Sequence, residues 1–80
     1  MKRQVVVARL QVIFENAFGR KFEIAEESEA NRITGWDSLT HMAIMLEIEK
    51  AFSIRFSLFE MEKGRSMRHL INLILEKVSA

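Results

Sequence analysis

Apolar side chains recur every three or four residues along the first part of the chain, which predicts an amphipathic helix over residues 2–18. The predicted buried face consists of Val6, Leu10, Ile13 and Ala17, with Val7, Phe14 and Phe18 at its edges. Gly19 follows as a helix stop, and Arg20 and Lys21 lie close to the negative end of the helix dipole. Consecutive valines are also typical of a strand, but the helical period continues for two more turns.

A second helix is predicted from Asp37 to about Phe52. Asp37 is a suitable N-cap, because its carboxylate accepts hydrogen bonds from the free backbone N–H groups of the first turn. The predicted core stripe contains His41 or Ile44, then Met45, Ile48 and Phe52, and a second apolar line contains Leu39, Met42, Ala43 and Leu46. Together the two lines exceed what a surface helix buries, which leaves apolar surface for a partner or for a wider core.

The remaining segments predict a long loop and two further helices. Residues 20–36 lack a helical period, and a loop of this length in a compact domain is typically functional. Its expected anchors are Phe22, Ile24 and Ile33. A short helix is predicted over residues 58–63, ending at Gly64, and Ser66 begins the last helix. The predicted buried residues of that helix are Met67, Leu70, Ile71, Ile74 and Val78.

Composition and charge narrow the class of protein. The chain has 80 residues, of which 49% are hydrophobic, so we expect a single all-α domain over residues 1–80. The expected fold is an irregular four-helix bundle with three long helices, a short third helix and a long loop between the first two. The absence of cysteine excludes disulfides and thiolate zinc sites. A net charge of +1 argues against non-specific nucleic-acid binding, and no apolar run could span a membrane, so we expect a soluble cytoplasmic protein.

The sequence Gly35-Trp36-Asp37-Ser38-Leu39 opens the predicted second helix. Ser38 is expected at the first helical position, with its hydroxyl facing solvent. The start of a helix presents unpaired N–H groups and a partial positive charge, which stabilise an anion. A phosphodiester on Ser38 would lie in that field, so the position permits a phosphate-linked modification without requiring one.

The Asp-Ser-Leu tripeptide resembles the signature of acyl and peptidyl carrier proteins, in which the serine bears 4′-phosphopantetheine. The resemblance extends over nearly the whole chain. Residues 39–52 are similar to the family's second helix in length and apolar pattern, and residues 53–63 are similar to its turn and short third helix. It implies an acyl-carrier-protein-like fold with 4′-phosphopantetheine, taken from coenzyme A, on Ser38, and with Asp37 and Leu39 beside it. It implies no catalytic residue, because such a carrier holds acyl or aminoacyl intermediates as thioesters on the arm.

The same resemblance implies a set of partner enzymes. A phosphopantetheinyl transferase attaches the arm, an acyl- or aminoacyl-loading ligase or transferase adds cargo, and a downstream synthase or transferase receives it. The residues expected to dock these enzymes are Met42, Ala43, Leu46, Glu49, Leu58 and Met61. The pathway would be fatty-acid, polyketide, peptide or other specialised biosynthesis. We expect a monomer that binds no metal, nucleic acid or membrane.

Three features depart from the family's usual pattern. Family members are commonly acidic, whereas this chain is nearly neutral and has Ala43 and Lys50 where acidic residues are frequent. Trp36 stands where primary fatty-acid carriers usually have a small residue. Ile33 and Thr34 replace the usual Asp-Leu pair. These differences favour a specialised stand-alone carrier with its own loading enzyme over the general fatty-acid carrier.

Alternative interpretations were weighed against this one. A hydrolase built from Asp37, Ser38 and His41 is disfavoured, because neighbouring positions on one helix do not give the geometry of a catalytic triad. The stronger alternative is a small helical interaction module without a prosthetic group, in which the second helix binds a partner. We expect Trp36 to anchor the loop on the core, and the two histidines, His41 and His69, to be packing or surface residues. For Met42 and Leu46, a place in the core and a place on the docking surface are about equally expected.

Overall fold

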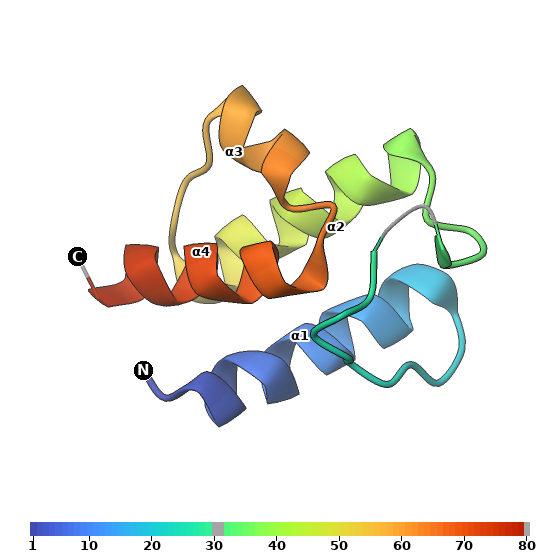
Figure 1. Ribbon diagram of the computed structural model, residues 1–80, viewed down its shortest axis with the longest axis horizontal. Coiled ribbons are helices and arrows are strands. Elements are labelled where there is room, and N and C mark those ends of the chain that lie inside the picture. The colour runs from blue at the N-terminus through green and yellow to red at the C-terminus, as the bar shows by residue number, and fades with distance from the viewer. Residues whose placement is uncertain (30–31, 80) are drawn as a thin grey trace.

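The computed structural model describes residues 1–29 and 32–79, and these form four α-helices (Figure 1). The helices are α1 (Arg3–Phe18), α2 (Ser38–Phe52), α3 (Leu58–Lys63) and α4 (Met67–Ser79). All four helices begin, and the first three also end, within about one residue of the predicted position, because apolar period, caps and glycine stops are local features of the sequence. The all-α, four-helix prediction is confirmed. None of these helices is long and apolar enough to cross a membrane.

Helix α1 packs against both α2 and α4, and α3 packs against α4. In Figure 1, α1 and α4 lie side by side, and the start of α1 and the end of α4 are on the same side of the molecule. Gly19 ends α1 in the left-handed conformation with φ of 66°, which glycine adopts without a steric penalty. The long loop then leads the chain to the start of α2.

The buried face of α1 differs from the predicted one by a rotation about the helix axis. Val6, Leu10 and Phe14 are fully buried, whereas Ile13 is half-buried and Ala17 is exposed. The rotation follows from an aromatic cluster, because the ring of Phe14 lies 5.1 Å from the rings of both Phe22 and Trp36. Edge-to-face and tilted contacts of this kind add to the burial of apolar area. The prediction that Ala17 belongs to the core is therefore wrong.

Both predicted apolar lines of α2 are present, and only one of them is in the core. The buried residues are His41, Ile44, Met45, Ile48 and Phe52. All four residues of the second apolar line are exposed, namely Leu39, Met42, Ala43 and Leu46. The second line therefore lies on the surface. Met42 and Leu46, for which core and surface positions were equally expected, are surface residues.

The second half of the chain supplies the rest of the core. Ser57 and Glu60 form a capping box at the start of α3, since each side chain accepts from the other residue's backbone N–H. Helix α4 buries Met67, Leu70, Ile71 and Ile74. Val78 was predicted to be buried and is only half-buried, because it lies in the last turn. Among the loop anchors, Phe22 is buried while Ile24 and Ile33 are half-buried.

Candidate functional site

Ser38 is the first residue of α2, and its side chain is exposed to solvent, as predicted. The preceding residue, Asp37, is extended, with φ of −94° and ψ of −176°, and its Oδ1 accepts a hydrogen bond of 2.8 Å from the Thr40 backbone N–H. That hydrogen bond lowers the pKa of the Asp37 carboxyl below its ordinary value of 3.8. Asp37 is thus turned onto the helix backbone as its cap, while Ser38 presents its hydroxyl outward.

Trp36 fixes the loop immediately before this site. Its side chain is 5% exposed, and its Nε1–H donates to Nδ1 of His41 over 3.0 Å. Because an indole nitrogen only donates, Nδ1 of His41 is the acceptor and the ring proton lies on Nε2. Nε2 then donates to the carbonyl oxygen of Met61 over 2.6 Å. The predicted anchoring role of Trp36 is confirmed, and His41 is a packing residue that links the loop, α2 and α3.

An open groove lies beside Ser38, between the long loop and the turn that joins α3 to α4. Its lining includes Ser38, Glu29, Glu62, Lys63, Arg65 and His69. Nη2 of Arg65 lies 3.5 Å from Oγ of Ser38. Arg65 lies 27 positions from Ser38 along the chain and was not among the predicted site residues. No local pattern relates the two residues, because only the path of the whole chain brings them together.

The residues predicted to dock partner enzymes lie on α2 and α3. The exposed fractions are 82% for Leu39, 40% for Met42, 50% for Leu46 and 80% for Leu58, and Phe59, which was not predicted, is 69% exposed. Glu49 is half-buried, and its carboxylate accepts from the Phe56 N–H over 2.8 Å. Met61 is half-buried and packs against the core. Glu49 and Met61 thus have structural contacts of their own, and their docking role stays a prediction.

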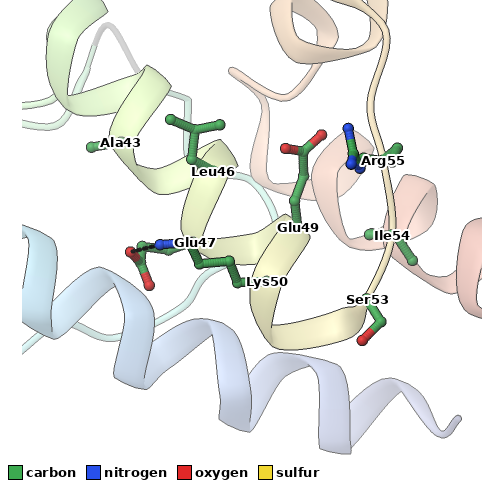
Figure 2. A pocket seen from close by; sticks show the side chains of 8 residues that line it. All are labelled: Ala43, Leu46, Glu47, Glu49, Lys50, Ser53, Ile54 and Arg55. Atoms are coloured by element: carbon green, nitrogen blue, oxygen red, sulfur yellow. Dashed lines mark ion pairs between the residues drawn. The ribbon is translucent and has the colours of Figure 1, made fainter.

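A second groove lies toward the other end of α2, and Figure 2 shows the side chains that line it. Ala43, Leu46 and Glu49 come from α2, while Ile54 and Arg55 come from the segment that follows. This groove begins at Ala43, five residues or about 7.5 Å along the helix axis from Ser38, and continues to Arg55 beyond the end of α2. Three of its lining residues, Ala43, Leu46 and Glu49, belong to the predicted docking surface.

The chemistry available at Ser38 is that of an accessible hydroxyl. The imidazole of His41 is buried and hydrogen-bonded to Trp36 and Met61, and the carboxylate of Asp37 is hydrogen-bonded to the Thr40 N–H. Arg65 donates hydrogen bonds and does not accept a proton at neutral pH. Among residues 1–29 and 32–79, no cluster of three histidine or acidic side chains is placed to hold a metal ion. The side-chain group that approaches Oγ of Ser38 is Nη2 of Arg65, a hydrogen-bond donor, so the site is suited to modification by another protein.

Comparison with known proteins gives two close structural matches. The solution structure of a holo acyl carrier protein from Geobacter metallireducens is 31% identical over 92% of this chain and 86% of that one, with a TM-score of 0.84. The crystal structure of an acyl carrier protein from Thermotoga maritima is 25% identical over 99% of this chain and 93% of that one, also with a TM-score of 0.84. No family model matches the chain, and no curated protein sequence matches it significantly.

Proposed function

This chain belongs to the acyl carrier protein family and is a carrier protein rather than an enzyme, and we propose that Ser38 bears its 4′-phosphopantetheine arm. The observation that carries the proposal is the exposed Ser38 hydroxyl at the first position of α2, within the Asp-Ser-Leu tripeptide. One of the two structural neighbours is a holo acyl carrier protein, which supports the presence of a prosthetic group here.

The surroundings of Ser38 fit a phosphodiester. The backbone N–H groups of the first turn of α2 are unpaired apart from the cap, and they favour negative charge at this point. The guanidinium of Arg65 adds a full positive charge within 3.5 Å of Oγ. Ser38 is exposed, so a transferase can approach its hydroxyl from solvent.

Attachment of the arm is a simple substitution at phosphorus. Oγ of Ser38 forms a bond to the phosphorus that bears pantetheine in coenzyme A, the bond to the departing 3′,5′-ADP breaks, and the hydroxyl proton passes to a base in the transferase. Mg²⁺ bound in the transferase neutralises the phosphate charge during the substitution. Asp37 contributes by capping α2, because its Oδ1 accepts from the Thr40 N–H beside the attachment position. When bound, the prosthetic group supplies a terminal thiol that holds acyl or aminoacyl cargo.

The exposed apolar residues of α2 and α3 support a docking role for this face. Leu39, Met42 and Leu46 follow one another along α2 from Ser38, and Leu58 and Phe59 are exposed on α3. A carrier must leave each enzyme after transfer, and small interfaces with modest affinity meet that need. The chain's net charge of +1 favours partner enzymes that recognise apolar contact over partners that recognise an acidic helix. The pathway served is one of fatty-acid, polyketide, peptide or other specialised biosynthesis.

The direct test is transfer of the arm in vitro. Unmodified protein is incubated with coenzyme A, Mg²⁺ and a broad-specificity phosphopantetheinyl transferase, and its intact mass is measured. We expect the mass to rise by one arm in the native sequence and in Ser79→Ala, an exposed serine at the end of α4, and no rise in Ser38→Ala. Failure of the native sequence to gain mass, or an equal gain in Ser38→Ala, contradicts the proposal.

A further inference from the structure

We propose that Arg65 binds the phosphate of the arm and thereby fixes the direction in which the arm leaves Ser38. This inference rests on the proposed attachment at Ser38 and adds a phosphate-binding residue from a different part of the chain. The observation behind it is the 3.5 Å approach of Nη2 of Arg65 to Oγ of Ser38. The oxygens of a phosphate bonded to Oγ extend further into the groove, so the same guanidinium can reach them.

The backbone around Arg65 is held in place from two sides. On one side is Gly64, where an added Cβ would lie 3.1 Å from Cε of Met45 and 3.3 Å from the carbonyl oxygen of Met61. Glycine at this position thus lets the turn between α3 and α4 lie directly against α2 (Figure 1). On the other side, the Met67 N–H donates to the Ser28 carbonyl oxygen over 3.0 Å, which joins the turn to the long loop. The position of Arg65 beside Ser38 is therefore a consequence of packing.

The side chain of Arg65 is also oriented. Its Nε donates to Oε2 of Glu62 over 3.3 Å, three residues earlier in the chain. The Arg65 side chain is 36% exposed, whereas that of Arg32 is 80% exposed. Glu62 thus occupies Nε and leaves the Nη groups for another acceptor. Arginine presents its donors as a planar fork that matches two oxygens of a phosphate, which suits this residue to the task.

Other charges near the groove do not replace Arg65. The ammonium of Lys63 lies 4.9 Å from the ring centroid of Phe59, on α3. The carboxylate of Asp37 is turned onto the Thr40 N–H, so it does not point at the phosphate position. Glu29 and Glu62 also line the groove and oppose an anion there, so a cation placed directly beside Oγ of Ser38 offsets their charge. His69 lines the same groove and is exposed.

The test uses protein that carries the arm, prepared with the transferase and verified by intact mass. The ³¹P resonance of the phosphodiester and the ¹⁵N side-chain resonances of arginine are recorded for the native sequence, Arg65→Gln, Arg65→Lys and Arg55→Gln. Arg55→Gln is the matched control, since it removes the same charge near the far end of α2. Circular dichroism checks that each variant keeps its helices.

We expect the Arg65 side-chain resonances to shift when unmodified protein receives the arm. We also expect Arg65→Gln to shift and narrow the ³¹P resonance, Arg65→Lys to restore part of the change, and Arg55→Gln to leave the resonance as it is. If the arm is attached but Arg65→Gln and Arg55→Gln give the same ³¹P spectrum as the native sequence, the inference is wrong and the attachment stands. If the native sequence accepts no arm, both proposals fall.

Discussion

Asp37 and Ser38 are exposed neighbours in the chain whose side chains make different contacts. Asp37 is directed at the backbone of α2, where it accepts from the Thr40 N–H over 2.8 Å, and Ser38 is directed at solvent. The cap begins the helix at one definite residue, and this places the hydroxyl of the next residue outside the hydrogen-bonded ladder. An aspartate before the serine is therefore useful to a carrier even though it performs no chemistry.

The ionised state of Asp37 should contribute to stability. The hydrogen bond from Thr40 lowers its pKa in the folded protein below the ordinary value of 3.8, so its contribution is present above that value and is lost as the pH falls through the folded pKa. Asp37→Asn keeps a capping oxygen but loses the charge. We expect the free energy of unfolding of Asp37→Asn to be below that of the native sequence at neutral pH and to converge with it as the pH falls below 3.8 and through the folded pKa of Asp37. Urea denaturation at several pH values measures this.

A companion variant separates charge from capping. Asp37→Ala removes the acceptor itself, so we expect it to be less stable than Asp37→Asn at neutral and at acid pH. A constant difference between the native sequence and Asp37→Asn across the acid range would show that ionisation of Asp37 is unimportant.

At this scale the sequence was informative about local relations only. The N-cap, the exposure of Ser38 and the anchoring by Trp36 were predictable, because each depends on residues within a turn or on a large apolar side chain in a polar loop. The approach of Arg65 to Ser38 was not predictable, because it depends on how closely the turn after α3 lies against α2.

Helices α2 and α3 and the end of the long loop are joined by the hydrogen bonds of Trp36, His41 and Met61. His41 is 2% exposed, and both of its ring nitrogens are used. A buried donor or acceptor that loses its partner costs about 1–3 kcal/mol. This chain of hydrogen bonds therefore secures the short helix α3, which buries no residue of its own completely.

His41→Phe tests this connection between elements. Phenylalanine keeps a planar aromatic ring at this position but leaves the Trp36 N–H and the Met61 carbonyl without their partner, so we expect a loss of about 1–3 kcal/mol in the free energy of unfolding. His69→Phe is the matched control at an exposed position of α4, where we expect a change within about 0.5 kcal/mol. Equal losses for the two variants would contradict the structural role of His41.

The elements themselves were largely predictable, whereas their rotation was not. Apolar period, caps and glycine stops located all four helices of the described chain. The apolar face of α1 was ambiguous, since Ile13 and Phe14 offered two adjacent stripes. Contacts of Phe14 with Phe22 and Trp36 decide between them, and those residues lie in a segment without a regular period.

On the scale of the whole molecule, large apolar side chains remain exposed on α2 and α3. Leu39, Leu58 and Phe59 are each more than two-thirds exposed, with fractions of 82%, 80% and 69%. Scattered exposed leucines are ordinary in proteins, but these residues lie on the two helices that adjoin the candidate site. This surface is therefore available for the docking role that we propose.

Leu39→Ala should separate docking from folding. Because Leu39 is exposed, we expect the free energy of unfolding of the variant to differ from that of the native sequence by no more than about 0.5 kcal/mol. We expect kcat/KM for arm transfer to fall by about fivefold, the effect of roughly 1 kcal/mol of lost contact with the transferase. Val12→Ala, which truncates a 57% exposed residue on α1, is the control and should leave kcat/KM unchanged. Equal kcat/KM values for the two variants would exclude Leu39 from the docking face.

Whether Ser38 carries a 4′-phosphopantetheine arm is tested without any added transferase on protein purified from the cells that naturally produce it. Fragment mass spectrometry should find the mass of the arm, with or without cargo, on the peptide that contains Ser38 and on no other peptide. If Ser38 is unmodified in cells whose other carrier proteins bear the arm, the account is contradicted, and a role as an interaction module without a prosthetic group takes its place.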